Sequence, residues 1–338
     1  TSCIHLEGAH RVVKLFRCVL EAVAPGTILI TETNVPHEEN ISYFGDGTDE
    51  AQMVYQFPLA PLVMHSILSG SAQALSRWAA ALETPSDQTA FFNFTASHDG
   101  IGVMPARGLL SEREVQALVD TVVDHGGQVS YKTNADGSRS VYELNISYFD
   151  ALSDPESTEA QATQVQRFVL SQAIMLALAG VPGIYIHSLI GSRSWQEGVE
   201  ITGRKRTINR ENLRRSELQT EMADPNSLRR QVYEAYHHLL EVRSASAAFH
   251  PQGGQRVLLP DDGIFALLRT SPDGRERVLC THNVTEEVKV MRVYPGDLGL
   301  LAEGSWPDLR LRGSLLGNER LVDLVAGVAE PTGATVSR

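Results

Sequence analysis

A regular alternation of helix-like and strand-like segments limits the folds open to this chain. Apolar residues recur at helical spacing over residues 9–23, 58–82, 164–179 and 227–242. Short apolar runs at 27–32, 51–57, 89–95 and 183–188 lie between them. The run at 27–32 does not alternate with polar residues, which is typical of a strand buried on both faces of a parallel sheet. The pattern predicts a parallel α/β fold, either a doubly wound sheet or a (β/α)8 barrel.

The hydrophobic pattern of the sequence changes near Ser244. Short alternating segments at 255–259, 263–269, 277–281 and 287–293 are separated by Pro-Asp, Pro-Asp-Gly or Asn turns, which predicts a small antiparallel β-sheet domain. Before that point, roughly sixty polar residues follow the third strand, too many for a plain connection. We therefore expect an α/β domain at 1–245, with an insertion at about 100–157, and a small β domain at 246–338.

Composition excludes several classes of protein. The 338 residues carry 29 Lys and Arg against 41 Asp and Glu, a formal charge of -12, which disfavours an extended nucleic-acid interface. Cys3, Cys18 and Cys280 are few and widely separated, as in a reducing compartment. The best membrane candidate, 168–187, is interrupted by Ser171, Gln172 and a Pro-Gly pair. We expect a cytoplasmic protein with free thiols that binds neither membrane nor nucleic acid.

Two carboxylates follow strand-like segments. Glu32 ends the first strand and Asp99 follows the third, and the carboxyl ends of parallel strands face the ligand site. Such a pair suits glycoside chemistry, in which one group donates a proton and the other stabilises an oxocarbenium ion. The alternatives are a strand-terminating polar residue for Glu32 and an Asx turn for Asp99. His98 and Asp99 are adjacent rather than spaced for convergent ligation, so no metal is expected.

A basic cluster follows the fourth strand in this acidic chain. It comprises Arg193, Arg204, Lys205, Arg206 and Arg210. These groups could bind sugar hydroxyls or a phosphate in a bidentate manner, or form a solvated charge run. Trp195 in the same loop is a candidate for stacking on a sugar, whereas Phe91, Phe92 and Phe94 are expected in the core. No glycine-rich nucleotide motif follows any strand.

Four motifs occur in a characteristic order. They are residues 31–37 (TETNVPH), 94–102 (FTASHDGIG), 182–185 (PGIY) and 206–210 (RTINR). In order and spacing they resemble the sucrose-phosphorylase-type enzymes of glycoside hydrolase family 13, and the resemblance covers nearly the whole chain. It implies a (β/α)8 TIM barrel, of which only strands five to eight are present, followed by the small antiparallel β domain.

The resemblance also implies a chemistry. Glu32 resembles the general acid/base, and Asp99 resembles the transition-state stabiliser. His98 and Arg206 are similar to residues that bind the glucosyl unit, and Arg210 belongs to the same motif. The implied reaction is phosphorolysis of an α-glucoside to α-glucose 1-phosphate with retention. It needs phosphate as co-substrate and neither a metal nor an organic cofactor, and a homodimer is a further expectation.

The chain departs from the family pattern at its beginning. The family nucleophile, an Asp after strand four, would lie about ten residues before Thr1, so two of three catalytic carboxylates are present. The chain shows no signal peptide, and Thr1 in place of Met suggests that residues upstream are missing. We expect the C-terminal portion of a longer enzyme, inactive alone, whose half-barrel exposes two sheet edges. An inactive carbohydrate-binding fragment is the alternative.

A second departure concerns the acceptor. Sucrose phosphorylases carry Tyr-Gln where this chain has Tyr142-Glu143, and the loop after the fourth strand also looks more like the glucosylglycerate phosphorylase branch. An anionic glycerate needs a cation, which Arg193 could supply. The open alternatives are phosphorylases of sucrose, sucrose 6-phosphate or glucosylglycerol, or a hydrolase or transglucosylase with the same carboxylates.

Overall fold

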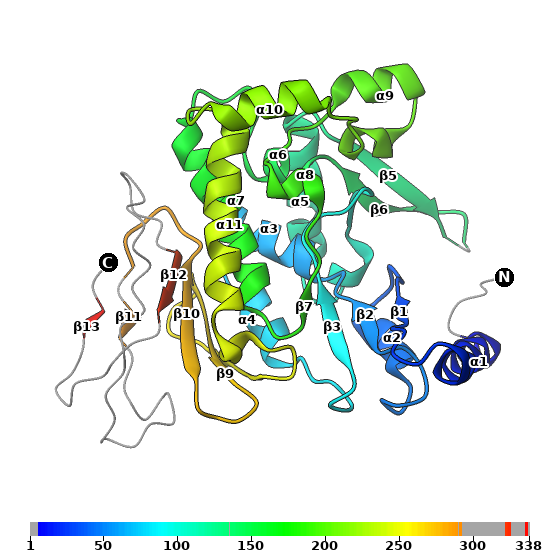
Figure 1. Cartoon of the computed structure of the whole chain (residues 1–338). Coiled ribbons are helices and arrows are strands. Elements are labelled where there is room, and N and C mark those ends of the chain that lie inside the picture. The colour runs from blue at the N-terminus through cyan, green and yellow to red at the C-terminus, as the bar shows by residue number, and fades with distance from the viewer. Residues whose placement is uncertain (1–5, 135, 290, 293–321, 326–334, 337–338) are drawn as a thin grey trace.

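A four-stranded parallel sheet organises the larger part of the molecule (Figure 1). The computed structural model describes residues 6–134, 136–289, 291–292, 322–325 and 335–336. The strands are β1 (Ile30–Thr31), β2 (Met53–Tyr55), β3 (Ala90–Asn93) and β7 (Val181–Pro182), in the order β1-β2-β3-β7. Every neighbouring pair is parallel. The strands lie side by side in chain order, as consecutive strands of a (β/α)8 barrel do.

Helices precede, separate and follow these strands. They are α1 (Glu7–Val23), α2 (His37–Ile41), α3 (Leu59–Ser69), α4 (Gln73–Ala80), α7 (Gln161–Ala177), α8 (Ile186–Leu189), α9 (Gln196–Thr202), α10 (Arg215–Ala223) and α11 (Leu228–Ser244). Helix α7 is buried from Gln164 to its end and contacts α3 and α11. Phe168 and Ile174 belong to the main apolar core with Leu62 and Tyr236.

Two predicted elements are wrong in detail. The helix expected over 58–82 is divided at Gly70, whose φ of 69° ends α3 in the left-handed region before α4 begins. The strand expected over 183–188 is β7 at Val181–Pro182, and part of that apolar run forms α8 instead. A short apolar run does not by itself distinguish a strand from a buried helix turn.

The first strand is less buried than its sequence suggests. Ile28 and Ile30 are 56% and 45% exposed, so the expectation that 27–32 is buried on both faces is wrong in this structure. The reason is topological: within the described residues β1 pairs only with β2 and forms an edge of the sheet. Helix α1 likewise leaves Leu15, Phe16 and Val19 exposed.

The insertion after β3 contains its own sheet. Strands β4 (Ile101–Gly102), β5 (Gln128–Thr133) and β6 (Arg139–Asn145) pair antiparallel in the order β4-β6-β5. Helix α5 (Glu112–Asp124) starts with a capping box between Ser111 and Glu114, and α6 (Tyr148–Leu152) follows β6. A 3₁₀ turn, η3 (Lys205–Asn209), contacts β6. This contact brings the RTINR motif to the insertion.

The antiparallel sheet predicted near the C-terminus is present. Strands β8 (Gly254–Leu258), β9 (Ile264–Thr270), β10 (Arg277–Asn283) and β12 (Val322–Val325) form it in the order β12-β10-β9-β8, and β11 (Met291–Arg292) pairs with β13 (Thr335–Val336). The segment expected over 287–293 includes β11, but residues 290 and 293 lie outside the described residues. The domain boundary at 245/246 stays a prediction.

Two of the three cysteines lie in the part of the chain that the structure describes, and both are free thiols: Cys18 is exposed and Cys280 is buried. Cys3 lies outside the described residues.

Candidate active site

Glu32 and Asp99 lie at the same end of the parallel sheet. Glu32 directly follows β1, and Asp99 lies in the loop that follows β3. Tyr55 ends β2 between them; burial raises the pKa of its phenol, and the nearby charge of Glu32 raises that pKa further. The Glu32 side chain therefore lies close to Tyr55 on the strand between the two carboxylates.

Aromatic rings line this end of the strands. The Tyr55 ring centroid is 4.9 Å from that of Phe92 and 5.1 Å from that of Phe94, and Phe57 contacts Phe94 edge-on at 5.2 Å. Gly183 allows this packing, because an added Cβ would lie 2.4 Å from the Phe92 ring. Phe91 belongs to a separate buried cluster with Phe44, and Phe94 is also buried, as expected of core residues. Phe92 is half-buried beside Tyr55.

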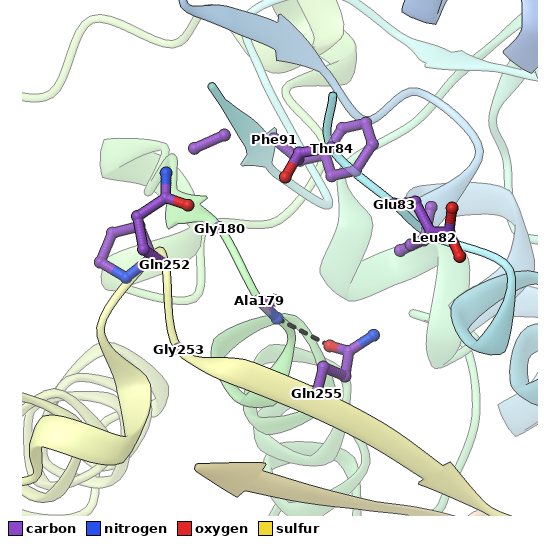
Figure 2. A pocket seen from close by; sticks show the side chains of 11 residues that line it. Leu82, Glu83, Thr84, Phe91, Ala179, Gly180, Gln252, Gly253 and Gln255 are labelled. Atoms are coloured by element: carbon purple, nitrogen blue, oxygen red, sulfur yellow. Dashed lines mark hydrogen bonds between the residues drawn. The ribbon is translucent and has the colours of Figure 1, made fainter. Parts of the chain in front are cut away.

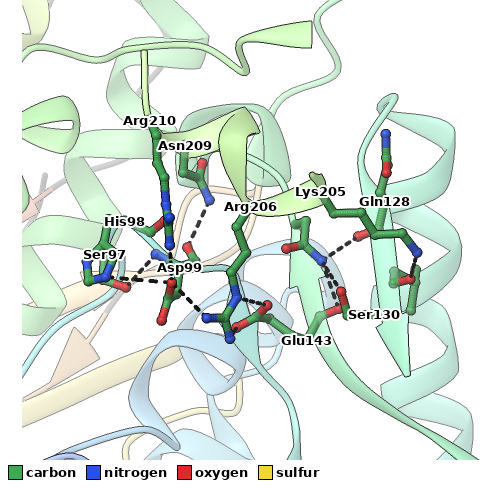
Figure 3. A network of polar contacts seen from close by, with 12 residues as sticks. Ser97, His98, Asp99, Gln128, Ser130, Glu143, Lys205, Arg206, Asn209 and Arg210 are labelled. Carbon is green, nitrogen blue, oxygen red and sulfur yellow. Dashed lines mark hydrogen bonds and ion pairs between the residues drawn. The ribbon is translucent and has the colours of Figure 1, made fainter. Parts of the chain in front are cut away.

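Asp99 is held by two arginines of the RTINR motif (Figure 3). Its Oδ1 lies 2.7 Å from Nη2 of Arg210 and 3.1 Å from Nη1 of Arg206. The backbone carbonyl of Asp99 accepts a hydrogen bond from Nδ2 of Asn209 at 2.9 Å. Asp99 therefore lies against two guanidinium groups that fix the position of its carboxylate, a preorganised arrangement that suits the stabilisation of developing positive charge.

Glu143 binds the other side of Arg206. Nε and Nη2 of Arg206 donate to Oε2 and Oε1 of Glu143, each at 2.9 Å, in a bidentate pair. Glu143 is only 3% exposed, and its hydrogen bonds raise the pKa of Arg206. Tyr142, the residue before Glu143, contributes to the same shift, which places it in the neighbourhood of Arg206.

His98 lies at the outer side of this cluster. Its side chain is 61% exposed, and its Nε2 is 3.7 Å from Oδ1 of Asp99. The backbone carbonyl of His98 accepts a hydrogen bond from Nε of Arg210 at 2.9 Å. The loop is thus fixed to Arg210 through its backbone while the imidazole remains accessible to a ligand.

The structure adds residues to which the sequence assigned no role. The hydroxyl of Tyr185 donates to the carbonyl of Asn209. Burial raises the pKa of Tyr185, Arg210 lowers it and Asp99 raises it, which places the phenol beside the cluster. Asn34 packs against Gly102, where an added Cβ would be 2.6 Å from its Nδ2. Tyr185 belongs to the PGIY motif and Asn34 to the TETNVPH motif, and each follows a strand of the parallel sheet. Their position after a strand could therefore have identified them as candidate site residues.

Arg193 is not among the side chains gathered around Asp99. Its Nη1 is 2.7 Å from Oδ1 of Asp150, its Nη2 donates to Gln164, and its guanidinium lies 4.8 Å from the Phe149 ring centroid. Asp150 is 1% exposed, so Arg193 neutralises a buried carboxylate. These are its contacts in the described part of the chain, and a role for Arg193 toward an anionic acceptor stays a prediction.

The other candidate residues that follow β7 make contacts elsewhere. Lys205 donates from Nζ to the carbonyl of Val129 at 2.6 Å, and Arg204 is exposed. Trp195, a stacking candidate, packs its ring against Gly198 of the helix that it precedes. Of the basic cluster, only Arg206 and Arg210 have contacts with Asp99 in the described residues.

A distinct pocket lies at the other end of the sheet. It has a volume of about 160 Å³ and is lined by the amino ends of β3 and β7 together with the segment before β8, including Phe91, Gly180 and Gly253 (Figure 2). Gln255 accepts a hydrogen bond from the Ala179 amide there. The amino ends of barrel strands serve stability rather than catalysis, so we do not place the chemistry in this pocket.

Two further findings concern the described part of the chain. No three His, Cys, Asp or Glu side chains there converge as a metal site would require. In that part, no helix is both long enough and apolar enough to cross a membrane.

Comparison with known proteins identifies the family, although no family model matches the chain. The chain is 52% identical over 291 residues to a glucosylglycerate phosphorylase of Allomeiothermus silvanus, which covers 86% of the chain and 52% of that protein. It is 48% identical over 322 residues to the Spirochaeta thermophila enzyme of that name, covering 95% of the chain and 53% of the relative. The chain belongs to the sucrose-phosphorylase-type enzymes of glycoside hydrolase family 13. It spans about half the length of these relatives.

Two solved structures share the fold of this chain. The crystal structure of sucrose 6F-phosphate phosphorylase from Thermoanaerobacter thermosaccharolyticum matches with a TM-score of 0.70 at 21% identity, covering 86% of this chain and 55% of that one. An alpha-amylase from H. orenii matches with a TM-score of 0.59 at 15% identity, over 90% of this chain and 51% of that chain. The predicted partial (β/α)8 barrel followed by an antiparallel β-sheet is therefore confirmed.

Proposed function

We propose that the protein containing this chain is a retaining phosphorylase that cleaves glucosylglycerate with phosphate, giving α-glucose 1-phosphate and glycerate. The observation that carries this proposal is identity: 46–52% to three glucosylglycerate phosphorylases, against 24–28% to sucrose phosphorylases and 24% to a glucosylglycerol phosphorylase. The last two groups support the same reaction type with other acceptors.

The roles of the two carboxylates follow from the chemistry of retention. A carboxylate nucleophile displaces glycerate from the anomeric carbon while Glu32 donates its proton to the departing oxygen. Phosphate then attacks the glucosyl–enzyme ester, and Glu32 takes the phosphate's proton as the ester bond breaks. Asp99, held by Arg206 and Arg210, stabilises the positive charge that develops on the sugar in both steps.

The nucleophile is assigned to the part of the enzyme that this chain does not contain. The relatives are about twice as long as their matched regions, which supports a barrel completed by further strands beside the exposed edge of β1. We propose that the reaction uses phosphate as co-substrate without a metal or organic cofactor. His98, Tyr142 and Arg210 are proposed to contact substrate, because each lies at or near the Asp99 cluster. The homodimer and the cytoplasmic location stay predictions.

The test is an assay of the complete protein with phosphate and each of four donors: glucosylglycerate, glucosylglycerol, sucrose and sucrose 6-phosphate. We expect α-glucose 1-phosphate from glucosylglycerate alone. Product from another donor alone would retain the reaction and replace the acceptor. Release of glucose without a requirement for phosphate would replace the phosphorylase with a hydrolase.

A further inference from the structure

We propose that Glu143 is a positioning residue that holds Arg206 against Asp99, rather than a ligand for the acceptor. This inference rests on the proposed glucosyl transfer at Asp99 and assigns Glu143 a place within it. Both carboxylate oxygens of Glu143 accept hydrogen bonds from Arg206 at 2.9 Å. The side chain of Glu143 is 4% exposed, so it presents little surface to a substrate.

The backbone around Glu143 is shaped to admit it. Glu143 lies on β6, paired with Gly102 of β4, and the loop that carries Asp99 runs directly into β4. An added Cβ on Gly100 would lie 2.6 Å from Cγ of Glu143 and 2.5 Å from the carbonyl of Leu144. The glycine next to Asp99 thus permits the close approach of the carboxylate that binds Arg206.

Arg206 depends on this carboxylate for a defined position. Its side chain is 41% exposed and comes from η3, which is a different segment from both carboxylates. A long, partly exposed arginine loses its fixed orientation unless a planar partner holds the guanidinium fork. With Nε and Nη2 bound to Glu143, the remaining nitrogen, Nη1, is directed to Asp99 at 3.1 Å.

The two possible roles of Glu143 predict different kinetics. A residue that positions Arg206 and Asp99 acts on the glucosyl unit, so its loss slows transfer from every donor. A residue that binds the acceptor affects only reactions in which that acceptor takes part. Glucosyl fluoride, whose leaving group is not glycerate, separates these cases when it is reacted with phosphate.

The experiment uses the complete enzyme with Glu143→Gln, which keeps the size of the side chain but replaces one acceptor oxygen with a donor. We expect kcat/KM to fall roughly 10- to 100-fold, and equally, for glucosylglycerate and glucosyl fluoride. The KM for glycerate in synthesis from α-glucose 1-phosphate should remain within about threefold, since the acceptor contacts are intact. Glu143→Asp, which keeps the charge, should recover part of the lost rate.

A matched control comes from a second Glu–Arg pair. Glu159 binds the guanidinium of Arg167 through both oxygens, away from the Asp99 cluster. Glu159→Gln should leave both kcat/KM values unchanged, and circular dichroism melting of all variants reports whether each is folded. If Glu143→Gln is unfolded, the test rests on Glu143→Asp alone. We then expect kcat/KM of Glu143→Asp to fall by the same factor for glucosylglycerate and for glucosyl fluoride.

Two outcomes would overturn the inference. A loss confined to glucosylglycerate, with a raised KM for glycerate, would make Glu143 an acceptor ligand. Unchanged kinetics with both donors would leave it without a role in transfer. Failure of the proposed function would be seen in the wild-type enzyme, which would then release glucose rather than α-glucose 1-phosphate. Even in that case, the rate of glucosyl fluoride hydrolysis would still measure the effect of Glu143.

Discussion

Nη1 of Arg206 lies 3.1 Å from Oδ1 of Asp99, although the two residues are separated by more than a hundred positions in the chain. Asp99 comes from the loop after β3, and Arg206 comes from η3, after β7. Together with the Glu143–Arg206 pair, their contact joins the insertion, the barrel and the basic segment into one cluster. The geometry of this ion pair decides how firmly the Asp99 carboxylate is held.

Arg206→Lys should lower kcat/KM of the complete enzyme roughly 10- to 100-fold with every glucosyl donor. Lysine keeps the charge, but a single ammonium cannot bind Glu143 through a fork and reach Asp99 as well. Arg204→Lys, two residues earlier and exposed, is the control and should have no effect. Equal kcat/KM values for both variants and wild type would show that the bidentate guanidinium of Arg206 is not needed for glucosyl transfer.

Glu32→Gln should abolish transfer from glucosylglycerate while sparing glucosyl fluoride. The glycerate oxygen needs a proton as it leaves, which is worth roughly 100- to 10,000-fold, whereas fluoride needs little protonation. Single-turnover rates with both donors in the complete enzyme measure the difference. An equal decrease for the two donors would show that Glu32 is not the proton donor.

Arg269→Met should destabilise the protein by about 2–4 kcal/mol. Arg269 is 0% exposed and donates to the carbonyl of Ala177, at the end of α7, and to that of His250. Burial lowers the pKa of Arg269 to about 10, yet it remains charged at neutral pH. Methionine fills the space but leaves these carbonyls without donors.

Arg275→Met is the matched control, because the Arg275 side chain is 88% exposed. Its effect should stay within about 0.5 kcal/mol. The midpoint of urea denaturation, followed by circular dichroism, measures both variants. Similar midpoints for the two would mean that the Arg269 contacts contribute no net stability.

His282→Gln should weaken the dependence of stability on acidity. His282 is fully buried, and burial lowers its pKa to about 4 from 6.5. Between these values the unfolded chain binds more protons than the folded one, so wild-type stability falls as the pH decreases from 6.5 towards 4. Above pH 6.5 the imidazole is neutral in both states and contributes no such dependence.

The test compares urea denaturation midpoints at pH 7 and pH 5. Wild type should lose about 2 kcal/mol more than His282→Gln over this interval. The difference between the two proteins at pH 7 corrects for the lost hydrogen bond to the carbonyl of Phe265. Parallel curves from pH 7 to pH 5 would show that His282 does not titrate on unfolding.

Local signals were sufficient for several elements and for part of the site. Continuous apolar runs at β2 and β3 and helical spacing at α7 and α11 each agree with the structure. Asp99 and Arg206 were identified as candidates because one follows a strand and the other belongs to a motif, and the structure brings them into contact. Residue type and position relative to a strand were enough in these cases.

Other features depended on partners that are distant in the chain. Arg193 has the same residue type as Arg206 and lies after the same strand, but Asp150 and Phe149 bind its guanidinium. The exposure of Ile30 likewise follows from the position of β1 at the edge of the sheet. No local pattern contains either fact.

The sequence by itself determined the alternation of helices with the strands of the parallel sheet, the antiparallel sheet that follows and the candidate carboxylates, because periodicity and residue type are local properties. Only the tertiary structure decided that Glu143 is buried against Arg206, and that Arg206 rather than Arg193 reaches Asp99. The physical reason is that an ion pair is defined by distance and burial, which depend on how separate segments pack.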